Sequence, residues 1–491
     1  MIRTMLIATT GLAAFGAGAS AQSAEEQLES RYRALAAIID ARLEREAVPG
    51  ASFGLIHDQS LVWSHHYGVE DKETGTPVTG DTVFSICSVS KLFNGVAAMS
   101  LVEEGSLDLD QPIFDYVGTD GPKDETGAEE TATLRNILSH VSGLPREGVE
   151  DFWTDTSFPD TAALMASTSA HDQLYRPYDH WQYSNLGMAL IGEAIAGASG
   201  KSWGDYITDT ILTPLGMSET RTDMPFEEVG NGFARGYYVR NGKGERAPVP
   251  EHTFKAYAPA AGIASSVNDM AKFASWHFRL HENGGEEILK ATTLRNMQRV
   301  HWVNQDFDGP AWGLAYAANR YGEKTLWGHG GYCPGSRTEF VMRLPDKTGY
   351  VMMMTANDVI TGFYTRLAYD FLNAKVTAVH GADDEAAEDE EDTGEVDTEA
   401  PDVDLSDFEG YYAPENYDWD RYIGIDDGKL FSISVFNSDP VKNMEIFVHD
   451  EGDRFYRQRD DESEGEPVIF ERDEAGNVVA IVQHSYRSYK R

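Results

Sequence analysis

Apolar and polar positions follow two different periods near the start of the chain. Between residues 24 and 46 large apolar side chains recur every three or four positions, which predicts an amphipathic helix. They are Leu28, Tyr32, Leu35, Ile39 and Leu43. Between residues 50 and 68 the pattern changes to alternation with a turn at Asp58 and Gln59, which is typical of a β-hairpin. The chain is therefore expected to lead from a helix into antiparallel strands.

Helical periodicity dominates residues 81–300, and several of the predicted helices end at a glycine, which suits a helix C-terminus. Strands return in residues 338–357 as two β-rich runs joined by a turn that contains Pro, Asp and Gly, and another helix is expected over residues 360–374. This order predicts an α+β domain with a helical subdomain. Its antiparallel sheet is assembled from both ends of the chain and flanked by helices.

A strongly acidic segment separates this domain from the C-terminal residues. Residues 383–404 carry no Lys or Arg and almost no large apolar side chain, so they are expected to form an extended, self-repelling linker. Beyond them, apolar and polar residues alternate between Gly, Asp and Asn turns, which predicts a small antiparallel β-barrel or sandwich. The predicted boundaries are 22–380 for the first domain, 381–404 for the linker and 405–491 for the C-terminal domain.

Residues 1–21 have the pattern of a secretory signal peptide. One Arg precedes a short apolar run, and Ala19, Ser20 and Ala21 supply small residues around the cleavage site. The alternative, an uncleaved membrane anchor, is disfavoured because the run is short and rich in Gly and Ala. We therefore expect export to the periplasm or outside the cell, with cleavage after Ala21 and no stable membrane insertion of the mature protein.

The charge balance excludes one large class of partners. Lys and Arg total 40 against 81 Asp and Glu, which gives a formal net charge of −41. Nucleic acids and anionic membrane surfaces are bound mainly through Lys and Arg, so neither is an expected partner. The two cysteines, Cys87 and Cys333, are too few for a disulfide scaffold or a cysteine-rich metal site.

Two serines compete for the role of a nucleophile, Ser52 and Ser88. The segment GASFG around Ser52 matches the G-x-S-x-G nucleophile elbow letter for letter. An elbow requires a helix directly after its serine, whereas here a second strand is predicted. We therefore expect Ser52 to be an ordinary strand residue, whose flanking glycines permit close backbone packing.

Ser88 is the stronger candidate because Lys91 follows three residues later at the start of a predicted helix. This spacing puts both side chains on one face within a single turn. A serine hydroxyl attacks poorly unless a base removes its proton, and a lysine can be that base only when its amine is neutral. Burial and the positive end of the helix dipole both disfavour the ammonium. The same helix start directs backbone N–H groups toward a developing oxyanion.

Further motifs follow in a fixed order. The triplet YSN at Tyr183 opens another predicted helix, and the triplet HGG at His329 begins what is expected to be a turn flanked by strands. With the segments GSLDLDQPI near Leu107 and LSHVSGLP at 138–145, the sequence resembles the penicillin-recognising serine hydrolases. These include class C β-lactamases, D-alanyl-D-alanine carboxypeptidases, D-aminopeptidases and β-lactamase-like esterases. The resemblance covers roughly residues 30 to 375.

The resemblance implies a role for each motif residue. Ser88 would be acylated, Lys91 would be its base, and Tyr183 would carry a proton to or from the leaving group. Asn185 would hold a substrate amide or carbonyl, and backbone N–H groups of Ser88 and Tyr332 would form the oxyanion hole. The other predicted substrate-binding residues are His329, Gly330, Gly331 and Tyr332. Acylation of Ser88, followed by attack of water, would require no metal or organic cofactor.

The third motif departs from the usual pattern of the family that the sequence resembles. β-Lactamases and most penicillin-binding proteins have Lys-Thr-Gly or Lys-Ser-Gly there, and the ammonium helps to anchor the substrate carboxylate. An unperturbed histidine has a pKa of about 6.5, so His329 would hold a carboxylate less firmly at neutral pH. We therefore expect hydrolysis of an ester or of a D-amino acid peptide or amide bond. The alternatives are β-lactamase activity or a catalytically silent binding protein of the same fold.

Several other side chains have simpler interpretations. Cys87 and Cys333 flank the two implied oxyanion donors and should lie on neighbouring elements. They are expected to be small buried side chains, with a disulfide as the alternative. His65 and His66 fall on opposite faces of a strand, which favours surface positions over a metal pair. His140 is expected to be structural, with a hydrogen bond near the cleft.

The C-terminal domain resembles the lipocalin-like barrels appended to D-aminopeptidase-type members. Such a domain would shape the cleft or bind another chain. The expected partner of the active site is a small-molecule or peptide substrate, and the loops at 146–180 and 220–256 would determine which one is accepted.

Overall fold

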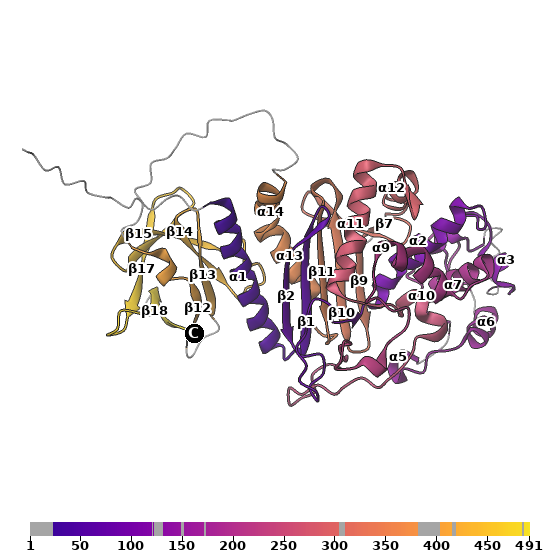
Figure 1. Ribbon diagram of the computed structural model, residues 1–491, viewed down its shortest axis with the longest axis horizontal. Helices are drawn as coiled ribbons and strands as arrows, with labels where there is room; N and C mark the ends of the chain where they lie inside the picture. Colours follow the sequence, from indigo (N-terminus) through magenta and orange to yellow (C-terminus); the bar gives the residue numbers. More distant parts are fainter. Residues whose placement is uncertain are drawn as a thin grey trace, which may run out of the picture. The chain divides into compact units, whose positions relative to one another are not determined.

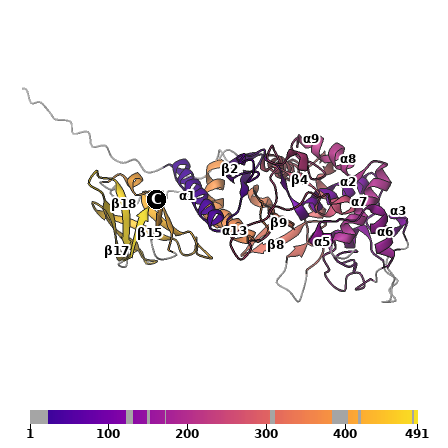
Figure 2. The ribbon, with the colours of Figure 1, turned by 90° about the horizontal axis from the view of Figure 1, so that it is seen from below.

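The computed structural model describes residues 23–119, 121, 131–148, 152–170, 173–303, 310–381, 403–414, 419–483 and 486–491. The predicted signal peptide and most of the predicted acidic linker lie outside the described residues. Contacts divide the chain into two units. Of the described residues, those within Ile38–Ala382 form one unit, and those up to Ala37 form the other together with those after residue 402 (Figures 1 and 2). No helix among the described residues is both long enough and apolar enough to cross a membrane.

A seven-stranded antiparallel sheet is the framework of the larger unit, in the order β2-β1-β11-β10-β9-β8-β7. Its strands are β1 (Gly50–His57), β2 (Ser60–Gly68), β7 (Ala311–Trp312), β8 (Ala317–Tyr321), β9 (Lys324–Cys333), β10 (Ser336–Arg343) and β11 (Thr348–Met354). Because β1 pairs with both β2 and β11, strands from the two ends of this unit lie side by side. The predicted hairpin and the predicted sheet assembled from distant segments are therefore confirmed.

Ser52 lies inside β1 and is not at a nucleophile elbow. It is opposite His66 on β2 and Met353 on β11, and it is fully buried. Its Oγ lies 2.8 Å from His66 Nδ1. A Cβ on Gly54 would lie 2.6 Å from Val267 Cγ1, so the glycine permits the close approach of a neighbouring element. The prediction that Ser52 is a strand residue is confirmed.

Helices cover both faces of the sheet. Adjacent residues of a strand point to opposite faces. Phe53 packs against Tyr364 of α13 (Thr361–Phe371), with ring centroids 5.8 Å apart, whereas Gly54 faces Val267 of α11 (Val267–Asn283). β1 and β11 are consequently buried along their whole length. The predicted helix over residues 360–374 is confirmed and is followed by α14 (Asn373–His380).

The helical subdomain is built around α2 (Ser90–Glu103). Every residue of α2 from Ser90 to Leu101 is buried, including the polar Ser90, Lys91, Asn94 and Ser100, so the helix is enclosed on all sides. It packs against α7 (Asn185–Ser199) and α10 (Ala258–Ala261), while the preceding turn η1 (Cys87–Val89) packs against β9 of the sheet. Ser88 therefore lies where the helical subdomain meets the sheet.

The remaining elements of this unit are short, apart from α6. The helices are α3 (Ile113–Val117), α4 (Leu134–Leu138), α5 (Phe152–Asp155), α6 (Thr161–Ala170), α8 (Trp203–Ile207), η2 (Thr208–Leu212), α9 (Thr213–Leu215), η3 (Phe226–Glu228), η4 (Lys255–Tyr257), α12 (Ala291–Met297) and η5 (Leu344–Asp346). β3 (Phe84–Ser85) pairs with β4 (Ala264–Ser265), and β5 (Glu286–Glu287) pairs with β6 (Leu289–Lys290).

The C-terminal residues form a closed antiparallel barrel. Its strands are β12 (Gly410–Ala413), β13 (Arg421–Asp426), β14 (Lys429–Ser434), β15 (Glu445–Glu451), β16 (Arg454–Gln458), β17 (Glu464–Arg472), β18 (Val478–Gln483) and β19 (Tyr486–Lys490), and β12 pairs with β19 to close it. Large apolar side chains such as Phe408, Phe447 and Phe455 form its core. Of the two predicted architectures, barrel and sandwich, the structure contains the barrel.

The first half of α1 (Ala24–Arg45) belongs to the same unit as the barrel. Ser30 Oγ accepts a hydrogen bond of 3.0 Å from the backbone N–H of Ile425 on β13. Arg33 forms two hydrogen bonds of 3.0 Å to the carboxylate of Glu409, and Arg31 pairs with Asp426. α1 thus forms polar contacts with residues of the barrel that are more than 350 positions away in sequence.

Gly192 of α7 provides a test of the packing between α7 and α10. A Cβ at Gly192 would lie 2.1 Å from Pro259 Cγ, whereas a Cβ at the exposed Gly197 of the same helix would meet only one atom, at 3.5 Å. We predict that Gly192→Ala lowers the Tm by about 2–8 °C through overpacking. Gly197→Ala should raise stability by up to about 1 kcal/mol through helix propensity. Equal thermal shifts for both variants in calorimetry would contradict this packing.

Candidate active site

Ser88 is held in a strained turn at the start of α2. Cys87, the preceding residue, has a φ of 51°, in the left-handed region that residues other than Gly, Asn and Asp seldom adopt. The turn is fixed to the segment after α10, because Ile86 N–H donates to the Ile263 carbonyl at 3.0 Å. In return, Ser90 Oγ accepts from Ile263 N–H at 3.0 Å. These contacts leave Ser88 half-buried with a defined orientation.

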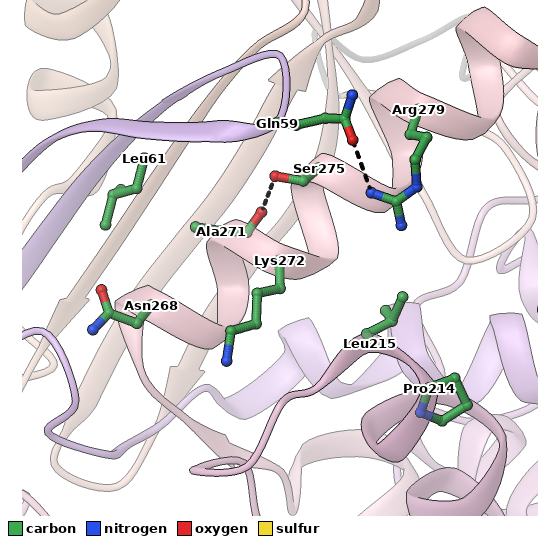
Figure 3. A pocket seen from close by; sticks show the side chains of 9 residues that line it. All are labelled: Gln59, Leu61, Pro214, Leu215, Asn268, Ala271, Lys272, Ser275 and Arg279. Carbon is green, nitrogen blue, oxygen red and sulfur yellow. Dashed lines mark hydrogen bonds between the residues drawn. The ribbon is translucent and has the colours of Figure 1, made fainter.

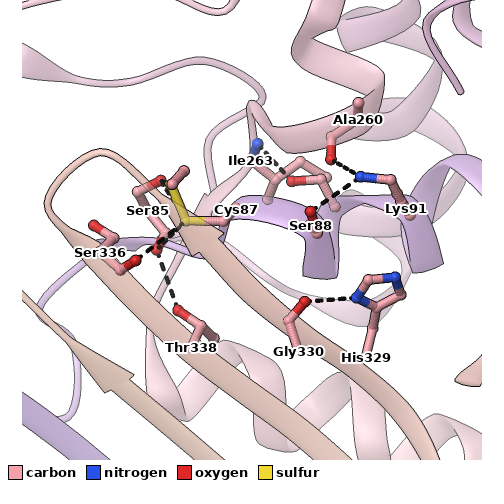
Figure 4. The surroundings of a disulfide bond; sticks show 12 residues. Ser85, Cys87, Ser88, Lys91, Ala260, Ile263, His329, Gly330, Ser336 and Thr338 are labelled. Carbon is pink, nitrogen blue, oxygen red and sulfur yellow. Dashed lines mark hydrogen bonds between the residues drawn. A yellow bond between two sulfur atoms is a disulfide. The ribbon is translucent and has the colours of Figure 1, made fainter. Parts of the chain in front are cut away.

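Lys91 is the predicted base and lies beside the nucleophile. Its Nζ is 3.0 Å from Ser88 Oγ and donates a hydrogen bond of 2.7 Å to the carbonyl of Ala260 (Figure 4). The side chain is fully buried. Burial holds the pKa of Lys91 well below its usual value. The negative charge of Glu147 opposes this shift, whereas the positive charge of Arg146 adds to it. A neutral Lys91 amine can therefore accept the proton of Ser88.

Tyr183 completes the group around the nucleophile. It is hydrogen-bonded to Ser88, and burial raises its pKa. The next residue, Ser184, caps α7, because its Oγ accepts the backbone N–H of Gly187 at 2.9 Å. The prediction that the YSN triplet opens a helix is thus confirmed. The structure brings Ser88, Lys91 and Tyr183 together as the motif order predicted.

Asn185, the first residue of α7, pairs with a buried carboxylate that the sequence reasoning missed. Its Nδ2 donates a hydrogen bond of 2.6 Å to Glu147 Oε1, and burial raises the pKa of Glu147. Asn185 Oδ1 is buried without a hydrogen-bond partner among the described residues, whereas the Glu147 carboxylate also accepts a hydrogen bond from the Trp153 side chain. Asn185 Oδ1 is an acceptor, so this corner of the site suits a substrate group that donates N–H or O–H. The available signal was the position of Glu147, the second residue after the LSHVSGLP segment.

The HGG triplet is part of a strand and does not form the predicted turn. His329, Gly330 and Gly331 lie within β9, opposite Phe340, Glu339 and Thr338 of β10. Glycine-rich sequences usually indicate turns, but here the pairing with β10 and the close contact with η1 determine the conformation. The prediction of a turn at this motif was wrong, and the substrate-side motif is carried by a sheet.

His329 is an uncharged side chain at neutral pH. Its Nδ1 lies 2.6 Å from the carbonyl oxygen of Gly330, which can only accept, so the proton belongs on Nδ1 and Nε2 carries a lone pair. Burial lowers the pKa of His329 to about 3, and a positive charge on Lys91 would lower it further. His329 is therefore an acceptor at neutral pH and cannot supply the positive charge of a third-motif lysine.

Gly331 allows β9 to touch the nucleophile turn. A Cβ on Gly331 would lie 2.4 Å from the carbonyl oxygen of Ile86 and 3.2 Å from Cys87 Cβ, whereas a Cβ on Gly330 would meet nothing within 4 Å. This contact brings together the elements that carry the two implied oxyanion donors, Ser88 and Tyr332. The Tyr332 side chain itself is 57% exposed, so its backbone is the part relevant to the site.

Cys87 and Cys333 form a disulfide, with Cα atoms 5.6 Å apart (Figure 4). The favoured interpretation of two free, small buried side chains was wrong, although both residues are buried and on neighbouring elements as expected. The close contact of β9 with η1 places both side chains between these elements, which a local sequence pattern cannot reveal. The bond joins the residues next to Ser88 and Tyr332, so it fixes the distance between the two backbone segments.

An aromatic wall lies beside Tyr183. The His140 ring packs in a tilted arrangement on the Tyr183 ring, with centroids 4.3 Å apart, and meets the Trp312 ring edge-on at 4.7 Å. Trp181 stacks on Trp312 at 5.7 Å. His140 Nδ1 accepts the backbone N–H of Ser184 at 3.3 Å, and burial holds its pKa well below the usual value. The predicted structural hydrogen bond of His140 is confirmed. The two tryptophans had no motif to identify them.

The other candidate positions contribute no second site. His65 Nε2 lies 2.6 Å from Asp40 Oδ1, and His66 contacts Ser52. Both histidines are half-buried rather than at the surface as expected, each with its own partner. The part of the chain that the structure describes contains no group of three or more His, Cys, Asp or Glu that could hold a metal ion.

A pocket of about 340 Å³ lies between α11, β2 and α9 (Figure 3), and Ser88, Lys91 and Tyr183 are not among the residues that line it. Its lining residues are Gln59, Leu61, Pro214, Leu215, Asn268, Ala271, Lys272, Ser275 and Arg279. Lys272 pairs with Asp269, and Arg279 pairs with Glu287 and bonds to Gln59. The two cations of this pocket are thus already paired, and Ser88 is not part of its lining. We therefore assign the catalytic chemistry to the surroundings of Ser88 and not to this pocket.

The contact between β9 and η1 can be tested with the two adjacent glycines of the third motif. We predict that Gly331→Ala destabilises the protein by about 1–3 kcal/mol, because its Cβ would collide with the Ile86 carbonyl. Gly330→Ala, which points into open space, should change the stability by less than about 0.5 kcal/mol. Chemical denaturation of both variants measures the difference in the free energy of unfolding. Equal stabilities would contradict the close contact between β9 and η1.

Comparison with known proteins gives a consistent result. A family model described as Beta-lactamase matches residues 35–374. Beta-lactamase-like protein 2 of Dictyostelium discoideum is 25% identical over 363 residues, which are 70% of this chain and 65% of that protein, slightly under two thirds of its length.

Solved structures show the same fold. The octameric penicillin-binding protein homologue from Pyrococcus abyssi aligns with a TM-score of 0.61 at 21% identity, over 93% of this chain and 99% of that one. The D-amino acid amidase from Ochrobactrum anthropi SV3, in its complex with L-phenylalanine amide, aligns with a TM-score of 0.57 at 26% identity, over 72% of this chain and 99% of that one. By its family match and its fold, this chain belongs to the Beta-lactamase family, the penicillin-recognising serine hydrolases.

Proposed function

We propose that this protein hydrolyses an ester bond, or an amide or peptide bond of a D-amino acid derivative, through an acyl-enzyme on Ser88. The observation that carries the proposal is the 3.0 Å contact between Ser88 Oγ and the buried Lys91 Nζ. Burial disfavours the ammonium form, so the amine is available as a base. The hydrogen bond between Tyr183 and Ser88 adds a second group through which the proton can move.

The proposed reaction has two balanced steps. In the first, Lys91 takes the proton of Ser88 as Oγ bonds to the substrate carbonyl carbon. Tyr183 gives its proton to the leaving group as the bond between that group and the carbon breaks, and Lys91 then returns a proton to Tyr183. In the second, water gives a proton to Lys91 or Tyr183 as its oxygen bonds to the acyl carbon, and the same residue gives a proton to Ser88 Oγ as the acyl–Oγ bond breaks, which releases the acid product and restores Ser88. Backbone N–H groups of Ser88 and Tyr332 would stabilise the oxyanion of both steps.

Two features favour an ester or amide substrate over a β-lactam. His329 offers a lone pair where a lysine ammonium would bind a carboxylate, so a β-lactam carboxylate loses an ionic partner there. Asn185 Oδ1 is a buried acceptor atom without a partner among the described residues, two positions after Tyr183, which suits a substrate that donates N–H. The D-amino acid amidase that shares this fold acts, by its name, on substrates of that class.

We also propose that the protein works in the periplasm or outside the cell. The Cys87–Cys333 disulfide supports this location, since such bonds persist in oxidising compartments. The signal-peptide pattern of residues 1–21 is the independent sequence argument for export.

A matched substrate panel tests the reaction. Mature protein is assayed with p-nitrophenyl butyrate, D-alanine p-nitroanilide and nitrocefin. We predict selective turnover of the ester or of the D-amino acid anilide. Ser88→Ala and Lys91→Ala should each lower kcat/KM by at least about 10³-fold, as expected for a nucleophile and its base.

The variants also define failure of this proposal. Ser52→Ala serves as a control for loss of a buried serine hydroxyl outside the proposed site. Nitrocefin turnover as efficient as ester turnover would overturn the substrate assignment, and full activity of Ser88→Ala would overturn the mechanism. An inert wild-type protein with an unreactive Ser88 would favour the binding-protein alternative.

A further inference from the structure

Two adjacent residues of opposite charge border the catalytic group and have no role in the steps above. Arg146 and Glu147 follow the LSHVSGLP segment, with Arg146 Nε 3.6 Å from Glu147 Oε1. The Arg146 side chain is 60% exposed, whereas that of Glu147 is only 20% exposed. Two neighbouring charges of opposite sign, one screened by solvent and one buried, would affect the site unequally.

The backbone of this segment is fixed to the start of α7. The carbonyl of Arg146 accepts hydrogen bonds from the backbone N–H groups of Asn185 at 2.9 Å and Leu186 at 3.1 Å. Ser184 Oγ donates to the carbonyl of Pro145 at 2.8 Å. The YSN motif therefore holds Arg146 and Glu147 in place, and neither belongs to a free surface loop.

The Tyr183 ring lies near two cationic side chains. Arg146 Cζ is 4.8 Å from the centroid of this ring, and Lys91 Nζ is 4.9 Å from the same centroid. Arg146 is permanently charged, so a second positive charge on Lys91 would be repelled. The buried carboxylate of Glu147 has the opposite effect, because a negative charge favours an ammonium nearby.

We propose that Arg146 and Glu147 are an opposed pair of positioning residues that sets the pH range in which Lys91 and Tyr183 can transfer a proton. Arg146 keeps Lys91 neutral and favours negative charge on Tyr183, and Glu147 works against both. This inference rests on the proposed function, because it concerns the proton transfers of that reaction.

The remaining polar groups around the pair leave these two charges dominant. His140 and His329 face the same space, and burial lowers the pKa of each, so neither is charged at neutral pH. Ser88 and the Ala260 carbonyl contact Lys91 without a net charge. The directions agree with the geometry: Arg146 lowers the pKa of both Lys91 and Tyr183, and Glu147 raises the pKa of both.

The test is the pH dependence of two rates, kcat/KM for the preferred substrate and covalent labelling of Ser88 by a fluorophosphonate probe. In the wild type both rates should rise as pH increases through the lowered pKa of Lys91, because the neutral amine is the active form. Arg146→Gln should move this rise to higher pH by about 0.5–1 unit, and Glu147→Gln should move it to lower pH by a similar amount. Arg146→Lys, which keeps the charge, should restore most of the wild-type profile.

Salt provides a second readout that a structural role would not produce. Since Arg146 is more exposed than Glu147, added salt should move the wild-type rise to higher pH and leave Arg146→Gln almost unchanged. Unfolding temperatures of all three variants are measured alongside, so that misfolding is recognised.

The outcomes separate this inference from the proposed function. Ser88 labelling with unchanged pH profiles in Arg146→Gln and Glu147→Gln would overturn the inference alone. A loss of rate that is equal at every pH, with no shift, would also overturn it and leave a structural role. A wild-type protein without Ser88 labelling would overturn both the proposed function and the inference that rests on it.

Discussion

The burial of one amine, that of Lys91, is the constraint on which the rest of the structure depends. An ammonium without an ionic partner is costly to bury, so the structure favours the neutral form and creates a base next to Ser88. That burial requires α2 to be enclosed on all sides. The helical subdomain covers α2, and η1 before it packs against the sheet, so the basicity of one side chain follows from the arrangement of both parts.

The second requirement is a fixed relation between β9 and η1. Gly331 permits backbone contact with Ile86, and the Cys87–Cys333 disulfide joins the two elements covalently. β9 is held in turn by its pairing with β10, which pairs with β11 at the centre of the sheet. The large sheet therefore serves the site indirectly, because it holds the strand of the third motif against the nucleophile. His329 comes from that strand as a neutral acceptor, which distinguishes this site from one that holds a lysine.

Local periodicity was sufficient to predict α1, the hairpin of β1 and β2, and α7, and the spacing of Ser88 and Lys91 predicted their contact. Features that depend on distant segments could not be predicted in the same way. The glycines of the third motif gave no strand signal, because the extended conformation of β9 depends on its pairing with β10. The disulfide depends on the contact between β9 and η1. Arg146 and Glu147 belong to a loop, where charge carries no periodic signal. The contact of α1 with the barrel could not be predicted either, because the composition of the predicted linker does not indicate where the barrel packs.

The most direct measurement of the central claim is the identity of the acylated residue. Protein mixed with p-nitrophenyl butyrate is quenched in acid during turnover, digested, and mapped by mass spectrometry for the butyryl group. The account predicts the adduct on the peptide that contains Ser88, and its absence in Ser88→Ala. An adduct on Ser52 or another residue, or turnover without any adduct under conditions that trap acyl-enzymes, would contradict the claim that Ser88 is the nucleophile activated by a buried, neutral Lys91.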